Sequence, residues 1–173
     1  MSTIPFQDWL EITQTAYRFA YALDIHDWDL MRSVLAQQVE IDSGTAARNT
    51  QWTHISSGKI AADEHIWNVK VLETGLDGVQ HLMGNPQVTI NGDIATLVVG
   101  FYGEHVFQDT TGSQSYTLGG YQTITLQNSR QRWLISAFKV HPLWTKGNVE
   151  VVDRAIQKGL ELLTDRGESP PRR

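Results

Sequence analysis

The fold of this 173-residue chain is decided by residues 17–29, which read YRFAYALDIHDWD. Apolar side chains lead into and through this stretch at the three-and-four spacing of a helix that buries one stripe: Ile12, Ala16, Phe19, Ala20 and Leu23. The helix is predicted to run from about Phe6 to Leu23, and the apolar stripe ends at Asp24. A carboxylate at the inner end of a core-facing helix costs free energy unless it is paired, hydrogen-bonded or used in chemistry. The position of Asp24 therefore indicates a pocket.

Two phenols accompany this carboxylate. Tyr17 and Tyr21 lie seven and three residues before Asp24, so the three side chains are predicted to occupy adjoining faces of the helix. The next carboxylate, Asp27, is predicted to cap a second helix over roughly residues 28–36.

Composition narrows the functional classes. Charged residues are 19% of the chain, the net charge is −5 and there is no cysteine. The length predicts one domain over residues 1–166, followed by a disordered Pro- and Arg-rich tail over 167–173. No basic stripe predicts a nucleic-acid partner, and no apolar run approaches the roughly 20 residues that span a bilayer. With no signal-peptide pattern at the start, a cytoplasmic protein is expected.

The remaining chain is predicted to change from helices to strands. The expected elements are a short strand over 39–43, a polar loop over 43–57, a helix over 59–72, strands over 81–90, 95–106, 116–127 and 133–141, and a closing helix over 149–163. A tight hairpin is expected at residues 91–93, which read NGD. Helices first and an antiparallel meander afterwards indicate an α+β domain, whose sheet must curl around the helices and enclose a cone.

This order of elements resembles the nuclear transport factor two-like (cystatin-like) superfamily of SnoaL-like polyketide cyclases, ketosteroid isomerases and scytalone dehydratases. Residues 23–32 (LDIHDWDLMR) with 39–42 (VEID), and residues 80–84 (QHLMG), are most similar to the scytalone dehydratase and SnoaL-like branch. Residues 133–139, Trp144 and the closing helix match that branch's last strand and C-terminal cover. The resemblance spans roughly residues 12–159. It implies a cone-shaped α+β fold in which N-terminal helices pack on a curved, mixed, mostly antiparallel sheet and a C-terminal helix closes the domain.

The resemblance also implies site residues. The helix aspartate of the branch falls on Asp24, its strand histidine on His81, and the second dehydratase histidine on His105. The chain departs from the dehydratase pattern at four positions, which carry Phe19, Leu23, Ser43 and, near the substrate-binding asparagine, Gln122. These differences weaken the expectation that scytalone itself is the substrate. The Asp–His pair remains, and it also occurs in relatives that eliminate halide rather than water.

The expected chemistry follows from these residue types. A histidine is a suitable base because its ordinary pKa lies near working pH, and a carboxylate behind it fixes the tautomer. His81 is the predicted base, Asp24 its orienting partner, and His105 or a tyrosine the donor to a developing oxyanion or leaving group. The residues predicted to bind substrate are Tyr17, Tyr21, Trp67, Tyr102, Tyr121, Gln122 and Trp144.

Simpler interpretations stand beside these. Asp24 could serve only as a helix-end residue, and His81 could be a strand-end histidine satisfied by its surroundings. His26, His54, His65 and His141 favour surface, core or rim roles, and no metal site is predicted because no two histidines form a compact ligand motif.

The leading hypothesis is a cofactor-independent lyase or isomerase of secondary metabolism, acting on a small, mainly apolar, oxygenated ring compound. Dehydration is the first choice of reaction, and cyclisation or double-bond isomerisation is the second. The rival hypothesis is a non-catalytic ligand-binding or assembly subunit. A homo-oligomer, dimer or trimer, is expected to form through the outer face of the sheet.

Overall fold

The computed structural model of the chain describes residues 4–44, 57–108 and 112–171. Its helices are α1 (Phe6–Ile25), α2 (Trp28–Val34), α4 (Ala62–Gly75) and α5 (Glu150–Asp165). Its strands are β1 (Leu35–Asp42), β2 (Gly58–Ala61), β3 (Gly78–Asn91), β4 (Ile94–Val106), β5 (Ser115–Ser129) and β6 (Arg132–Gly147). The polar loop predicted over residues 43–57 lies almost wholly outside the described residues.

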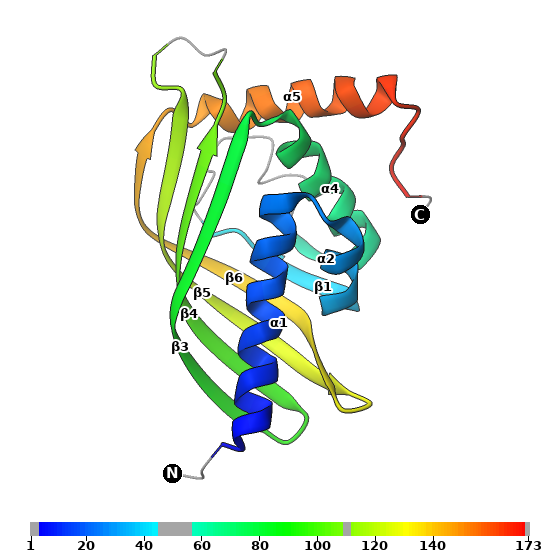
Figure 1. Cartoon of the computed structure of the whole chain (residues 1–173), viewed down its shortest axis with the longest axis vertical. Coiled ribbons are helices and arrows are strands. Elements are labelled where there is room, and N and C mark those ends of the chain that lie inside the picture. The colour runs from blue at the N-terminus through cyan, green and yellow to red at the C-terminus, as the bar shows by residue number, and fades with distance from the viewer. Residues whose placement is uncertain (1–3, 45–56, 109–111, 172–173) are drawn as a thin grey trace.

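The first helix has the predicted amphipathic character. α1 lies along the inner side of the curved sheet and buries one stripe against it (Figure 1). It ends two residues later than predicted, where His26 adopts a left-handed conformation with φ of 57° and its backbone N–H bonds to the carbonyl of Leu23. The predicted cap of α2 is confirmed, because the Asp27 side chain accepts the Leu30 N–H at 2.9 Å. The tight turn between α1 and α2 thus fixes where Asp24 lies.

Two element boundaries differ from the predictions for one reason. Leu35 and Ala36, predicted as the end of a helix, begin β1, and residues 59–61, predicted as the start of a helix, form β2. β1 pairs in parallel with β6 on one side and antiparallel with β2 on the other. Sheet pairing therefore overrides the local helical pattern at both places.

The sheet is mixed and mostly antiparallel, which confirms the predicted fold class. Its strand order is β2-β1-β6-β5-β4-β3, and only the β1–β6 pair is parallel. The register shifts between Gly84 and Gln87 in β3 and between Gly119 and Gly120 in β5. Such bulges bend a strand and increase its twist. The long strands consequently curve around the helices, as Figure 1 shows.

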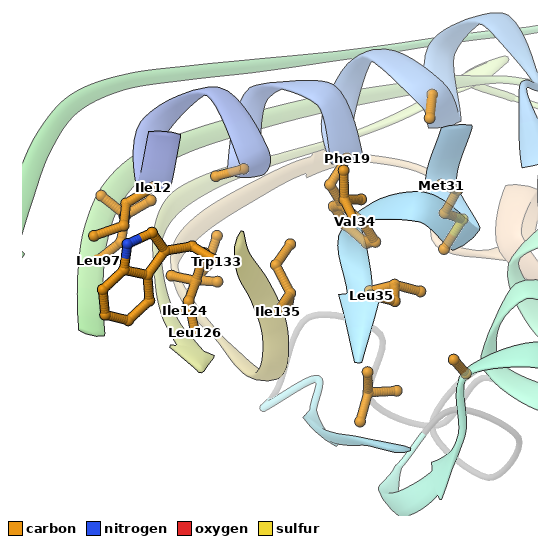
Figure 2. Packing of buried hydrophobic residues seen from close by; sticks show 14 of the residues in the cluster. Ile12, Phe19, Met31, Val34, Leu35, Leu97, Ile124, Leu126, Trp133 and Ile135 are labelled. Carbon is orange, nitrogen blue, oxygen red and sulfur yellow. The ribbon is translucent and has the colours of Figure 1, made fainter. Parts of the chain in front are cut away.

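The main core lies between α1 and the inner face of the sheet. Its labelled members in Figure 2 come from both layers and pack against one another: Ile12, Phe19, Met31, Val34, Leu35, Leu97, Ile124, Leu126, Trp133 and Ile135. Buried apolar side chains of this size stabilise a domain by roughly 1.5–3 kcal/mol each. Some of its members also line a cavity that lies between this core and a second one.

A second core joins α4 and α5 at the opposite end. The helices approach so closely that a Cβ on Gly75 or Gly159 would lie 1.8 Å from a backbone oxygen of the other helix. Beyond α5, Glu168 forms an ion pair with Lys70 of α4. None of the helices among the described residues has the length and apolarity needed to cross a bilayer.

Candidate functional site

A mainly apolar cavity of about 110 Å³ opens between α1, α4, α5 and the inner face of the sheet. Its polar lining residues are Ser43, His65, Glu73, His81, His105, Tyr116 and Gln122. An apolar cavity of about 150 Å³ holds a benzene molecule. The space is therefore suited to a ligand no larger than one small ring.

His81 lines this cavity, and Asp24 lies behind it in contact with its ring. Asp24 Oδ1 lies 2.8 Å from His81 Nδ1, and the backbone N–H of His81 donates to both carboxylate oxygens at 2.9 and 3.1 Å. The His81 side chain is 6% exposed and that of Asp24 is 20% exposed. Since an ionised carboxylate only accepts, Nδ1 carries the ring proton and Nε2 keeps a lone pair. The predicted pairing of these two residues is thus present in the structure.

The local folds on either side explain the pairing. Asp24 occupies the last turn of α1, one residue past the apolar stripe, and α1 packs against β3. His81 lies near the start of β3, where its ring faces inward and stacks on Phe101 of β4 with centroids 5.7 Å apart. The helix and strand therefore bring together residues 57 positions apart.

His105 faces the same cavity from β4. Its side chain is buried, and its ring meets that of His81 edge to face with centroids 5.5 Å apart. His105 Nδ1 lies 3.3 Å from the carbonyl oxygen of Tyr116, so in this bond Nδ1 is the donor. Burial, assisted by the nearby His81, lowers the His105 pKa from 6.5 to about 4. At neutral pH the ring is consequently uncharged and its Nε2 carries no proton.

Glu73 of α4 is a polar lining residue that the sequence analysis missed. It is 3% exposed, and its Oε2 has no hydrogen-bond partner among the described residues. Burial raises the Glu73 pKa from 4.5 to about 7, while His81 opposes that rise and Asp24 adds to it. The helix was predicted to end at Leu72, which left Glu73 outside it. A carboxylate four residues after Val69 on the buried stripe was the available signal.

His65 is the second missed residue. It is 1% exposed, lies on the inner side of α4, and stacks against Phe19 with ring centroids 6.3 Å apart. Burial lowers its pKa to about 3, so the ring is neutral at pH 7. It contributes a polar edge to an otherwise aromatic part of the wall.

Most of the residues predicted to bind substrate do not line this cavity. Gln122 does, and it is 6% exposed. The other six do not line the cavity, and they lie on the surface or pack against the edges of the two cores: Tyr17, Tyr21, Trp67, Tyr102, Tyr121 and Trp144. Successive strand residues face opposite sides of a sheet. Because His105 and Gln122 face the cavity, Tyr102 and Tyr121, at odd spacings from them, face the outer side. Tyr102 donates to Glu104 at 3.0 Å, and Tyr121 stacks on His141 with centroids 4.4 Å apart.

One group of residues has ligand types that suit a metal. Ligand atoms of Glu73, His81 and His105 all lie within 4.8 Å of one another. A Zn²⁺ ion at roughly 2.0–2.2 Å from each ligand holds any two of them no more than about 4.4 Å apart. Metal binding here would require each pair of ligand atoms to lie no more than about 4.4 Å apart. The expectation of no metal site stays a prediction.

Comparisons with known proteins agree with this architecture. Residues 6–139 match the model of a family described as the SnoaL-like domain. No curated protein sequence matches the chain.

Among solved structures, the Kfla4162 protein of Kribbella flavida is 18% identical, with a TM-score of 0.73 over 84% of this chain and 97% of its own. A candidate scytalone dehydratase from Novosphingobium aromaticivorans is 13% identical, with a TM-score of 0.67 over 82% and 87%. A candidate dehydratase of the NTF2-like family from Streptomyces avermitilis is 12% identical, with a TM-score of 0.64 over 81% and 99%. At these identities the likeness shows the fold, and the predicted cone-shaped fold is confirmed.

Proposed function

Because the chain belongs to the SnoaL-like domain family, we propose that it is a cofactor-independent lyase acting on a small, mainly apolar, oxygenated ring compound. The observation that carries this proposal is the Asp24–His81 pair, 2.8 Å apart at the wall of an apolar cavity. The dehydratases among the structural neighbours support the choice of reaction class by analogy.

In the proposed reaction, His81 Nε2 removes a proton from a carbon next to the substrate carbonyl. Asp24 does not touch the substrate. It holds the Nδ1 proton, fixes the ring orientation, and stabilises the imidazolium that forms. General-base catalysis of this kind contributes roughly 10²–10⁴-fold to a rate. The electron pair of the broken C–H bond then forms a double bond as the leaving group departs from the neighbouring carbon.

The size of the cavity directs the choice of test substrate. We expect β-hydroxycyclohexanone, a single ring with an acidic C–H and a hydroxyl leaving group, to be converted to cyclohexenone, whose absorbance reports turnover. The variant His81→Asn should lose at least about 10²-fold in rate. The control is His141→Asn, which alters a histidine on the outer face of the sheet. Equal turnover by wild type and His81→Asn would refute the proposal.

Isomerisation and cyclisation use the same base and remain the alternatives. Cyclohexanone has no leaving group, so uptake of solvent deuterium at the carbon next to its carbonyl reports the base alone. A protein that catalyses this exchange but does not eliminate water from β-hydroxycyclohexanone would favour these alternatives. A protein that binds cyclohexenone but catalyses neither exchange nor elimination would instead support the ligand-binding rival. The expected homo-oligomer stays a prediction, which light scattering of the purified chain would check.

A further inference from the structure

The cavity holds a carboxyl group that the base pair does not use. Glu73 projects from α4 toward His81 and His105, and one of its carboxylate oxygens lies within 4.8 Å of a ring nitrogen of each histidine. Its Oε2 lacks a hydrogen-bond partner among the described residues. Leaving a buried polar group unpaired costs roughly 1–3 kcal/mol, and more if the group is charged. An unpaired polar atom that faces a cavity requires an explanation, and a ligand in the cavity provides one.

The other polar lining residues are poor proton donors. His105 has its only ring proton on Nδ1, which faces the Tyr116 carbonyl, and its pKa of about 4 leaves Nε2 unprotonated at pH 7. His65 is also neutral at pH 7, because burial lowers its pKa to about 3. Burial raises the pKa of the Tyr116 phenol above its ordinary value of 10, which makes it a weaker acid. Gln122 can donate a hydrogen bond but cannot release a proton.

We propose that Glu73 is the general acid of this site and that the leaving group is therefore a hydroxyl, which departs as water. This inference rests on the proposed function, because it supplies the second half of the elimination. A halide departs without being protonated, whereas a hydroxyl requires a proton, so a donor opposite the base selects for oxygenated substrates. Burial, which raises the Glu73 pKa to about 7, keeps a large fraction of the group protonated at neutral pH.

The step is balanced in protons and electrons. His81 Nε2 takes the C–H proton, the C–H electron pair forms the carbon–carbon double bond, and the C–O bond breaks with its electron pair going to oxygen. That oxygen takes the Glu73 proton and leaves as water. The products are an enone, a His81 imidazolium and a Glu73 carboxylate. Since the two groups lie within 4.8 Å, the imidazolium can return its proton to Glu73 directly or across one water.

The kinetic test compares two leaving groups on one ring. The probes are β-hydroxycyclohexanone and β-chlorocyclohexanone, which both yield cyclohexenone, with the protein-independent rate subtracted. Glu73→Gln keeps the shape of the side chain but cannot donate a proton. It should lower the rate on the hydroxyl probe by at least about 10²-fold and change the rate on the chloro probe by less than about 3-fold. Glu73→Asp should restore part of the lost rate, and Glu64→Gln on the same helix is the matched control.

The outcomes separate this inference from the proposed function. Suppose that His81→Asn lowers turnover of both probes, while Glu73→Gln lowers both rates equally or changes neither. The role of His81 as base is then supported and the role of Glu73 as acid is refuted. If His81→Asn loses neither, the proposed function fails. A second measurement does not require turnover: the infrared difference between wild type and Glu73→Gln at pH 5 should contain a carboxylic acid band that shifts when cyclohexenone binds. Absence of the band, or of its shift, overturns the role of Glu73 as donor.

Discussion

The carboxylate of Asp24 binds His81 at two points, the ring Nδ1 at 2.8 Å and the backbone N–H at 2.9 and 3.1 Å. The ring contact fixes the tautomer, and the backbone contact fixes the strand relative to α1. One residue thus couples the position of the proposed base to the packing of a helix on a sheet. Charge-assisted hydrogen bonds of this kind stabilise a fold by roughly 1.5–3 kcal/mol each.

We expect Asp24→Asn to separate these two roles. The amide oxygen can still accept the His81 backbone N–H, so unfolding in urea should show a loss of no more than about 3 kcal/mol. The ring, however, loses its charged partner and can adopt the wrong tautomer, which should lower turnover by about 10²–10⁴-fold. Nitrogen-15 NMR of the imidazole should change from a single Nδ1–H form to a mixture. Asp29→Asn, in the first turn of α2, is the control, and an unchanged tautomer in Asp24→Asn would contradict the assigned role.

The sequence predicted the parts of this site that depend on local pattern. Asp24 was placed by the end of an apolar stripe, and the turn that follows it was placed by the Asp27 cap. The inward orientation of His105 does not follow from the sequence, because the neighbouring Glu104 lies on the opposite face of the strand and alternation alone does not say which face is buried. The packing of α1 on the sheet decides that question, and it is a property of the whole fold.

The same alternation rule could have removed two of the proposed substrate contacts. In a regular strand, Tyr102 and His105 face opposite sides, as do Tyr121 and Gln122, so both members of a pair cannot line one cavity. Glu73 was missed for a different reason. The predicted helix ends at Leu72, one residue before Glu73, and a charged side chain is rarely expected at a buried position.

The Glu73 carboxyl group should make stability depend on pH in a defined direction. Its pKa is about 7 in the folded protein and 4.5 as a model value. The folded state therefore binds more protons between these pH values, and the stabilisation present below pH 4.5 is lost as the pH rises through 7. Across that window the loss from this group is on the order of 3 kcal/mol. Buried His65 and His105, whose pKa values are lowered to about 3 and about 4, add stability as the pH rises from 5 to 6.5 and so oppose this loss. The Glu73 contribution is therefore measured as a difference between wild type and Glu73→Gln in urea unfolding at pH 5 and pH 8.

Glu73→Gln carries no titrating group and should lose this contribution. Between pH 5 and pH 8 its free energy of unfolding should therefore fall less, or rise more, than that of wild type, by about 3 kcal/mol. Glu64→Gln on the same helix should follow the wild-type curve. A variant curve parallel to wild type would mean that Glu73 is ionised and stabilised in the folded protein, contrary to its buried position.

Gly103 is predicted to be required for the arrangement of the two histidines. A Cβ at this position would lie 3.1 Å from Phe101, 3.2 Å from His105 and 3.3 Å from His81. Gly103→Ala should therefore displace the imidazoles, with a stability loss of about 1–3 kcal/mol from overpacking and a larger proportional loss of turnover. Gly84→Ala in β3 is a matched control, since a Cβ there meets no atom within 4 Å. Wild-type turnover in Gly103→Ala would show that the rings tolerate the displacement.

The close packing of α5 against α4 should determine whether the cavity stays closed. A Cβ on Gly159 would lie 1.8 Å from the backbone oxygen of Val71, which no side-chain movement relieves. Gly159→Ala should push α5 away from α4, and with it Val152, which lines the cavity. We expect a stability loss of at least about 2 kcal/mol and weaker binding of cyclohexenone, measured by urea unfolding and by calorimetry. The control is again Gly84→Ala. If Gly159→Ala unfolds more easily but binds cyclohexenone as wild type does, α5 stabilises the domain without closing the cavity.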